Sequence, residues 1–335
     1  MYKGEKNMGK IVVMGAAILD VLVHPAPPEV FLTGSSPVST IRISTGGDAL
    51  NEAVRLAQLG IHPQLCTLLG KDDAGELIKA RCQKLGIGLE LAEETGEIPT
   101  SVNVVLVQEN GERNFLTNPA ATLRQLKMEH LPAKLPKDTQ ILSFASMFVS
   151  PWLKNQELSE IFSRAKKQGV TVCADMTKCK NRERARDMRE TLANVDYLFA
   201  NEEEAACLTG KKSYEEAAEE LLNCGAGCVI LKLGRRGCYA AAQKECFHVP
   251  AFRVPCVDTT GAGDSFAAGF LYGLMKGESL RRCAIMGNAC GALAVKQIGT
   301  EPDTPLKEEL DRLLAAVPDT KEEGKGKQNN GEKAI

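Results

Sequence analysis

The chain has 335 residues, of which 44% are hydrophobic and 25% are charged, the ordinary composition of a globular protein. Its formal net charge of −2 gives no basic excess, so neither nucleic acid nor an anionic membrane is expected as a partner. No run of about 20 apolar residues is present to span a bilayer, and the polar segment 1–10 lacks the apolar core of a signal peptide. We therefore expect a cytoplasmic protein.

The first recurring pattern along the chain is a short apolar run followed by an amphipathic helix. Near-continuous hydrophobic runs predict strands of a parallel sheet covered on both faces, at residues 10–15, 64–70, 139–145, 170–175, 195–201 and 228–234. Helical periodicity predicts helices at residues 48–59, 73–85, 151–168, 214–223, 264–275, 280–296 and 306–317. This alternation predicts a doubly wound α/β domain over residues 10–317, with a mostly parallel sheet and helices on both of its faces.

Two regions, 18–44 and 98–117, interrupt this pattern with alternating apolar and polar residues that favour strands. A turn at residues 109–112 suits a hairpin. Both regions follow the carboxyl ends of early strands, where open α/β sheets bind ligands, so we expect a small β-sheet lid over a cleft. Its exposed edge and apolar face predict a homodimer formed through the lid.

The last segment, 321–335, is rich in Lys, Glu, Gly and Asn and is predicted to be a disordered tail. The twelve cysteines include no Cys-x-x-Cys pair, and only four histidines accompany them. This pattern does not match a structural zinc site, so we expect reduced thiols that pack in the core.

The loop Asp258-Thr-Thr-Gly-Ala-Gly-Asp-Ser-Phe266 leads into an amphipathic helix. Gly261 and Gly263 let backbone N–H groups turn toward a common point, and the start of the helix adds partial positive charge, so the loop should hold an anion. Asp264 lies in the first turn, where its carboxylate can accept a proton from a hydroxyl that attacks phosphorus. The alternative is that Asp264 only complements the helix dipole and the glycines only shape a turn.

This loop resembles the C-terminal signature of the ribokinase-like (PfkB-type) carbohydrate kinase family. The segment 46–60, with a double glycine, an Asn four residues on and a closing glycine, is similar to the N-terminal signature of that family. The segment 15–20 (GAAILD) and the Asn-x-x-Glu motif 201–204 are two further matches. Four motifs in the right order over residues 10–315 make the resemblance specific.

The resemblance implies an ATP-dependent kinase with a ribokinase-like fold, in which Asp264 is the catalytic base. The backbone of Gly261, Ala262 and Gly263 would form the anion hole for the transferred phosphoryl group. This role fits the physics, because phosphoryl transfer depends on positioning and charge stabilisation.

The resemblance also assigns the acceptor side of the cleft. Asp20 and Asn51 would hydrogen-bond hydroxyl groups of the substrate. Gly46 and Gly47 would act as a hinge for closure of the lid, which keeps water from reacting with ATP.

On the nucleotide side, Asn201 and Glu204 resemble the pair that organises Mg²⁺ through water; the alternative is a helix start with solvated acids. Residues 231–237 resemble the strand and turn beside the nucleotide. Lys232 would meet an ATP phosphate, while Gly234 and Gly237 belong to the turn beside the base and ribose. Asn288 would border the adenine pocket or serve only in packing.

Some members of the family bind a monovalent cation beside the anion hole. Asp258 and Thr260 match that position, and Gly299 would supply a further carbonyl, so activation by K⁺ is a hypothesis.

The sequence departs from the family pattern at Asp48, which follows the double glycine. An acid there should repel phosphorylated or carboxylated substrates and favour a neutral or amino-bearing polyol, although Asp also suits a helix N-cap. Arg113 would reach the substrate from the lid or stay solvated on its hairpin. Asp175 ends a core strand and faces the cleft. The segment 144–150 lacks the acid used by some ribose-specific relatives, which weakens the case for ribose.

The sequence contains neither a P-loop motif nor a dinucleotide-binding glycine motif. The leading hypothesis is a kinase that transfers the γ-phosphoryl group of ATP to a hydroxyl of a small sugar or polyol. One alternative is a nucleoside kinase of the same fold, which would need a base-stacking pocket in a chain with 5% aromatic residues. Another is a non-catalytic regulator that binds a sugar or nucleotide, against which the presence of both Asp264 and the glycine loop argues.

Overall fold

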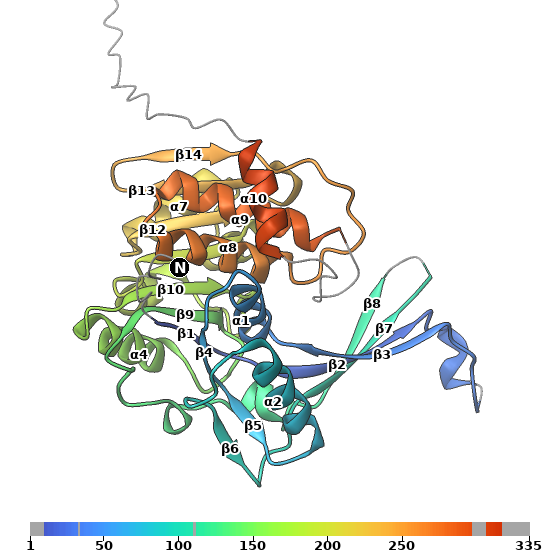
Figure 1. The fold of residues 1–335 in the computed structure, drawn as a ribbon. Coiled ribbons are helices and arrows are strands. Elements are labelled where there is room, and N and C mark those ends of the chain that lie inside the picture. The colour runs from blue at the N-terminus through green and yellow to red at the C-terminus, as the bar shows by residue number, and fades with distance from the viewer. Residues whose placement is uncertain (1–9, 33, 110–111, 297–305, 317–335) are drawn as a thin grey trace, which may run out of the picture.

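The computed structural model describes residues 10–32, 34–109, 112–296 and 306–316 (Figure 1). Its largest sheet has the strand order β14-β13-β12-β11-β10-β9-β1-β4. Six strands run parallel: β1 (Lys10–Met14), β4 (Gln64–Cys66), β9 (Thr139–Met147), β10 (Thr171–Met176), β11 (Tyr197–Asn201) and β12 (Cys228–Lys232). The antiparallel strands β13 (Cys238–Ala242) and β14 (Cys246–Val249) complete one edge.

Helices cover both faces of this main sheet, because successive strand residues point to opposite sides. Ile11 and Val13 pack in one apolar cluster and Val12 and Met14 in the other. The first cluster contains α1 (Asp48–Gln58), α2 (Asp73–Leu85), α8 (Ala262–Lys276), α9 (Leu280–Ala294) and α10 (Leu306–Ala315). The second contains α4 (Asn155–Lys167), α5 (Arg189–Leu192), α6 (Glu202–Thr209) and α7 (Tyr214–Asn223). The expectation of a doubly wound, mostly parallel α/β fold is confirmed.

A second sheet, which we call the small sheet, has the order β3-β2-β7-β8. Its strands are β3 (Thr40–Gly46), β2 (Ile18–His24), β7 (Val102–Val107) and β8 (Arg113–Thr117), and Figure 1 shows them extending away from the main body. The pairing places Asp20 beside Asn103 on one face and Val21 beside Val104 on the other. The small sheet therefore has one face with polar groups and one that is largely apolar.

Several shorter elements complete the fold. A two-stranded sheet joins β5 (Leu68–Gly70) to β6 (Glu93–Thr95). The remaining helical segments are α3 (Thr122–Gln125), η1 (Pro28–Phe31), η2 (Met128–His130), η3 (Ala185–Met188) and η4 (Gly234–Arg236).

Some predicted boundaries were wrong. The single strand expected at 64–70 is divided, since β4 joins the main sheet while β5 pairs with β6. The helix expected at 151–168 begins at Asn155, where the Glu157 carboxylate accepts the Lys154 backbone N–H. The predicted tail 321–335, Gly299 and the centre of the 109–112 turn lie outside the described residues.

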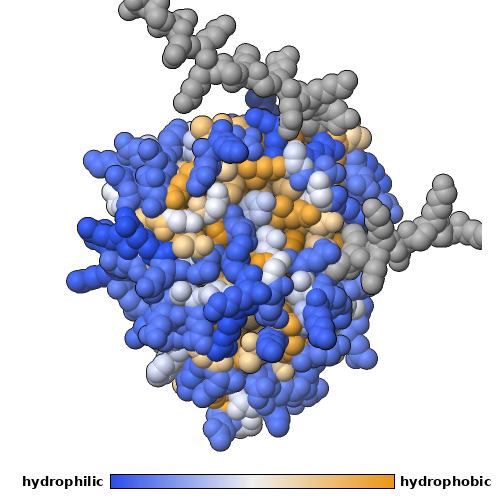
Figure 2. All heavy atoms as spheres, turned by 90° about the vertical axis from the view of Figure 1, so that its left-hand side faces the viewer, coloured by the Kyte–Doolittle hydropathy of each residue, from blue (hydrophilic) through white to orange (hydrophobic). Residues whose placement is uncertain are grey.

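Hydrophilic side chains surround a more apolar central area on the face seen in Figure 2, which is the left-hand side of Figure 1. The described helices include none that combines the length and the hydropathy needed to cross a membrane.

Candidate active site

A cavity of about 480 Å³ lies where β9 to β12 end and α8 begins. This is the edge of an open α/β sheet at which ligands characteristically bind. The cavity is lined by many of the residues singled out from the sequence: Asp48, Asn201, Glu204, Lys232, Gly234, Gly237, Ala262, Gly263, Asp264 and Asn288. The fold thus brings the acceptor, nucleotide and glycine-loop motifs to one place.

The predicted anion hole is built at the N-terminus of α8. Gly261 is the N-cap residue and has a φ of 71°, a left-handed conformation that favours glycine. The N–H of Ala262 donates to the Thr259 carbonyl at 3.2 Å. The N–H groups of Gly263 and Asp264, which follow in the first turn, have no partner earlier in the helix and are available to an anion. A Cβ atom on Gly263 would lie 3.4 Å from Lys232 Nζ, so the lysine ammonium reaches the same point as the loop backbone.

Asp264 projects from the first turn of α8, and one of its oxygens accepts a hydrogen bond of 2.8 Å from Asn51 Nδ2 on α1. The pKa of Asp264 is raised to about 8, first by burial and then by the negative charge of Asp48, while the Asn51 hydrogen bond opposes the shift. A carboxylate that only complemented the helix dipole would gain nothing from a buried position among other acids. The environment instead suits a group that exchanges a proton near neutral pH.

Lys232 forms an ion pair with Asp175 beside the predicted anion hole. Lys232 Nζ donates to both carboxylate oxygens of Asp175, at 2.7 Å and 2.6 Å, from the end of β12 to the end of β10. Burial opposes ionisation of both groups, yet the charges of Asp175 and Glu204 raise the pKa of Lys232, which keeps the ammonium protonated.

The acceptor side holds two carboxylates. Asp48 is the first residue of α1, and its side chain accepts a hydrogen bond from the Ser146 hydroxyl. The alternative that Asp48 serves as a helix N-cap is wrong, because the N-cap residue is Gly47 and no side-chain cap is present. The pKa of Asp20 is raised by burial, lowered by a hydrogen bond with Asn103, and raised again by Asp48.

The two glycines between these acids cannot be replaced without a clash. A Cβ on Gly46 would lie 2.1 Å from Asp20 Oδ2, and a Cβ on Gly47 would lie 2.6 Å from the Ala16 carbonyl oxygen. Gly47 also has a φ of 91°. The double glycine therefore lets the β3–α1 connection approach Asp20 closely, and its proposed role as a hinge stays a prediction.

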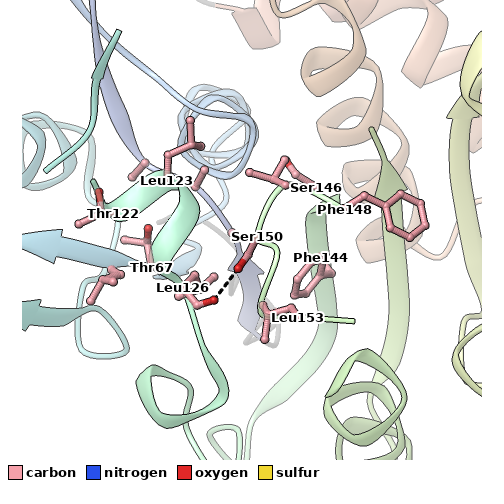
Figure 3. Close-up of a pocket in the computed structure, with 14 residues that line it drawn as sticks. Thr67, Thr122, Leu123, Leu126, Phe144, Ser146, Phe148, Ser150 and Leu153 are labelled. Carbon is pink, nitrogen blue, oxygen red and sulfur yellow. Dashed lines mark hydrogen bonds between the residues drawn. The ribbon is translucent and has the colours of Figure 1, made fainter. Parts of the chain in front are cut away.

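A second, water-sized cavity of about 20 Å³ is lined by Ser146 together with Phe144, Phe148 and Ser150 (Figure 3). The loop after β9 closes it, with the Ser150 hydroxyl donating to the Leu126 carbonyl at 2.7 Å. Phe148, in that loop, has a φ of 71°, which is unfavourable for a bulky side chain. This strained turn redirects the chain two residues after Ser146, the partner of Asp48.

Asn201 and Glu204 form a reciprocal cap at the start of α6. Asn201 Oδ1 accepts from the Glu204 N–H at 2.9 Å, and Glu204 Oε2 accepts from the Asn201 N–H at 2.7 Å. The helix-start interpretation is therefore correct for the local geometry, but both residues also line the cavity. Burial raises the pKa of Glu204 to about 7, against the lowering effect of Lys232.

The turn predicted to lie beside the nucleotide contains two glycines with different surroundings. A Cβ on Gly234 would meet no atom within 4 Å, so its surface is free for a ligand, whereas a Cβ on Gly237 would lie 2.0 Å from the Val249 carbonyl oxygen. Asn288 lines the cavity, and its Nδ2 donates to the carbonyls of Val249 and Pro250 at 3.0 Å and 3.3 Å. Its packing role and its position at the pocket are therefore compatible.

Arg113 reaches the glycine loop from the small sheet. Its Nη2 lies 2.7 Å from Asp258 Oδ1, and its Nη1 donates to the Thr260 hydroxyl. The Thr260 N–H and hydroxyl also donate to Asp258 Oδ1, at 2.9 Å and 2.8 Å. The alternative of a solvated hairpin arginine is wrong, and Arg113 contacts the loop rather than the cavity lining.

Sequence reasoning missed two features of this site. Ser146 was not recognised as the partner of Asp48, since the apolar run around it gave no signal. Asp175 was noticed only as a strand end that faces the cleft, although an acid and Lys232 at the ends of two parallel strands of one sheet, separated by a single strand, could have been paired. In the described part of the chain, no group of three or more His, Cys, Asp or Glu side chains is arranged to hold a metal ion directly.

Residues 8–307 match the model of a family described as pfkB family carbohydrate kinase. An ATP-dependent ribose-1-phosphate kinase of Halopiger xanaduensis is 30% identical over 266 residues, which cover 79% of this chain and 85% of that protein. An aminoimidazole riboside kinase of Salmonella typhimurium is 27% identical over 325 residues, which cover 93% and 97%. The crystal structure of a ribokinase from Thermotoga maritima superposes on this chain with a TM-score of 0.76 and 26% identity. The matched region covers 92% of this chain and 99% of the ribokinase chain.

Proposed function

Because the chain belongs to the pfkB family of carbohydrate kinases, we propose that it transfers the γ-phosphoryl group of ATP to a hydroxyl of a small sugar or polyol. Membership makes the protein a phosphotransferase with ATP as co-substrate. The observation that carries the finer proposal is the meeting of three groups at the start of α8. Asp264, the Lys232 ammonium and the glycine backbone converge there.

In the proposed reaction, the acceptor hydroxyl loses its proton to Asp264 as its oxygen attacks the γ-phosphorus. The bond between that phosphorus and the bridging oxygen breaks, ADP leaves, and the phosphorylated product carries the new P–O bond. Asn51 holds the Asp264 carboxylate in place through its 2.8 Å hydrogen bond. The backbone at Gly261–Gly263 and Lys232 stabilise the charge on the transferred group.

Asn201 and Glu204 would hold Mg²⁺ through its water molecules, since amide and carboxylate oxygens are the donors that this ion prefers. Mg²⁺ there would neutralise charge on the ATP phosphates. The burial of Glu204 and its raised pKa indicate that an arriving cation would meet a carboxyl group whose charge is otherwise poorly compensated.

The acceptor pocket favours a neutral or amino-bearing polyol. Asp20 and Asp48 are close enough that the charge of Asp48 raises the pKa of Asp20. Hydroxyl or ammonium groups would donate hydrogen bonds to these carboxylates, whereas a phosphate or carboxylate would be repelled. A screen of ADP release over pentoses, hexoses, inositols and nucleosides, with and without K⁺, tests this choice.

The small sheet is proposed to act as a lid and also as the homodimer interface. Its face opposite Asp20 carries Ile41, Ile43 and Leu116, which are 69%, 60% and 53% exposed. A contiguous apolar face of this kind favours burial against a second copy of the chain. A strictly monomeric species in multi-angle light scattering would contradict the proposal.

Activation by K⁺ stays a prediction. Asp258 and Thr260 present oxygen atoms near the anion hole, but Arg113 already places one positive charge on Asp258. An unchanged rate when K⁺ is replaced by tetramethylammonium would end this prediction.

The central test is Asp264→Asn, which keeps the shape of the side chain and removes its basicity. We expect transfer to fall by about 10²–10⁴-fold, the usual contribution of a general base, while ATP binding changes little. Asp73→Asn is the matched control, because Asp73 is an exposed first-turn acid of α2 outside the cavity. Near-native turnover in Asp264→Asn would contradict the proposed mechanism.

A further inference from the structure

The ion pair between Lys232 and Asp175 has a geometry that the proposed reaction does not by itself require. Lys232 Nζ lies within 2.7 Å of both Asp175 oxygens, so its ammonium is held in one direction by two hydrogen bonds. The side chains are only 16% and 7% exposed. Within the described residues, Asp175 is the one carboxylate that pairs with Lys232 at ion-pair distance.

Two acids compete for this lysine. Asp264 and Glu204 are close enough to raise the Lys232 pKa, yet the hydrogen bonds go to Asp175. An ammonium that moved onto Asp264 would stabilise its ionised form and make it a weaker base. The ammonium would also leave its present position beside Gly263, where a Cβ built on that glycine would lie 3.4 Å from Lys232 Nζ and where it faces the proposed anion hole.

We propose that Asp175 is a positioning residue, which keeps the Lys232 ammonium at the anion hole and away from the carboxylate of Asp264. This inference rests on the proposed function, because it gives the pair a role in phosphoryl transfer. Asp175 lies at the end of β10 and Lys232 at the end of β12, with β11 between them, so the rigid main sheet fixes their separation.

The role has a consequence for the pH dependence of the reaction. Asp264 is faced by charged or titratable groups from three elements: Asp48, Glu52 and Arg55 on α1, Asp175 on β10 and Lys232 on β12. Asp175→Asn removes a like charge, which lowers the pKa of Asp264, and frees Lys232, which lowers it again. Both changes have the same sign, so the direction of the shift does not depend on their relative sizes.

The first experiment compares wild type, Asp175→Asn and Asp175→Glu in steady-state transfer from MgATP to the best acceptor of the sugar, inositol and nucleoside panel. In Asp175→Asn we expect kcat to fall about tenfold or more, the loss typical of a misplaced charge-stabilising donor, with a smaller change in the KM for MgATP. The acid limb of the pH profile should move down by about one pH unit. Asp175→Glu should restore part of kcat and the position of the limb.

Asp196→Asn is the matched control, since Asp196 pairs with Lys166 at 2.6 Å away from the cavity, and an asparagine carbonyl can still accept the Val172 N–H that Asp196 binds. Circular dichroism establishes that each variant is folded. An acid limb that stays in place or moves up in folded Asp175→Asn would overturn the inference, as would an unchanged kcat.

A second measurement needs no acceptor. MgADP with aluminium fluoride mimics the transferred phosphoryl group, and transition-state mimics report interactions made to that group. By calorimetry, Asp175→Asn should bind this mixture about tenfold more weakly than wild type, with MgADP alone little changed, while Asp196→Asn matches wild type. Equal binding by Asp175→Asn would overturn the role of Asp175. A failure of the proposed function appears differently, as wild type that transfers phosphoryl to no acceptor on the panel.

Discussion

Two ion pairs flank the glycine loop, and they differ in what they connect. Lys232 and Asp175 join two strands of the main sheet, with Nζ–O distances of 2.6 Å and 2.7 Å. Arg113 and Asp258 join the small sheet to the loop before α8, with an N–O distance of 2.7 Å. Both acids are almost buried, whereas the Arg113 side chain is 29% exposed and that of Lys232 is 16% exposed.

The difference indicates that similar chemistry serves different purposes in the two regions. Parallel strands of one sheet cannot separate without unfolding, so the Lys232 pair is a fixed part of the proposed anion hole. The small sheet has its own hydrogen-bond ladder, so the Arg113 pair can open while both sheets stay folded. We therefore expect the first pair to govern the chemical step and the second to govern closure.

The largest expected effect comes from breaking the fixed pair at its cation. Lys232→Met should lower kcat by about 10²-fold or more, because it removes a charge-stabilising donor at the transferred group. Asp175 would lose its partner, and a broken buried pair costs about 3–5 kcal/mol of folding stability. Steady-state kinetics and thermal melts measure the two effects separately.

Lys166→Met is the control for this change, since Lys166 forms an ion pair of the same 2.6 Å length on the surface. Exposed pairs contribute about 0–1 kcal/mol, so this variant should keep both activity and stability. If folded Lys232→Met turned over like Lys166→Met, the assignment of Lys232 to the anion hole would be wrong.

A smaller effect is expected from the pair that can open. Arg113→Gln should lower kcat/KM by about tenfold, roughly 1.4 kcal/mol, because closure of the small sheet no longer gains the contact with Asp258. The same variant should respond more strongly to K⁺ than wild type, since the Asp258 charge then loses the Arg113 guanidinium. Titration of kcat/KM with KCl at constant ionic strength measures both changes.

Arg312→Gln is the matched arginine control, because Arg312 pairs with Glu308 in i,i+4 spacing on exposed α10. An Arg113→Gln enzyme with wild-type kcat/KM would remove the distinction between a fixed and an opening pair. It would leave Arg113 as a surface contact only.

The sequence was a good guide to the main sheet. Apolar runs such as Val229–Leu231 identify buried strands, and the boundaries of α2 and α7 were predicted residue by residue. The strand β13 was missed because its sequence, CYAAA, lacks the β-branched residues that mark a strand. Its place is set by pairing with β12, which is a tertiary effect.

The site was predictable where one segment carries both the geometry and the chemistry, as in the loop before Asp264. Contacts between distant segments were not predictable. Arg113 and Asp258 are 145 positions apart, and their meeting depends on how the small sheet is set against the main body. The change of sheet at Thr67, between β4 and β5, was likewise not predicted, because a single threonine within an apolar run is common inside one strand.

A third buried acid completes the comparison, because no cation among the described residues lies at ion-pair distance from it, although the charge of Lys232 acts on it from further away. Glu52 on α1 is 1% exposed, and its Oε1 finds no hydrogen-bond partner among the described residues. Burial raises its pKa to about 8, against the lowering effect of a hydrogen bond from Ser143. The folded protein therefore binds a proton at Glu52 that the unfolded chain releases near its ordinary pKa of 4.5. Stability from this group is full below that value, falls as the pH rises toward 8, and is constant above it.

Glu52→Gln keeps the shape of the protonated acid and cannot ionise. The variant should therefore not lose stability at this position as the pH rises. Between pH 4.5 and pH 8, the free energy of unfolding of the variant should gain about 1.4 kcal/mol on that of wild type for each pH unit. We expect the Tm of Glu52→Gln to exceed that of wild type by a few degrees more at pH 9 than at pH 6. Glu219→Gln, at an exposed position on α7, is the control, and its Tm should differ from that of wild type by the same amount at about pH 6 and pH 9. If the Tm difference between Glu52→Gln and wild type did not widen with pH, Glu52 would be ionised in the folded protein. A buried carboxylate would then be tolerated here without an ion pair such as those that Lys232 and Arg113 form.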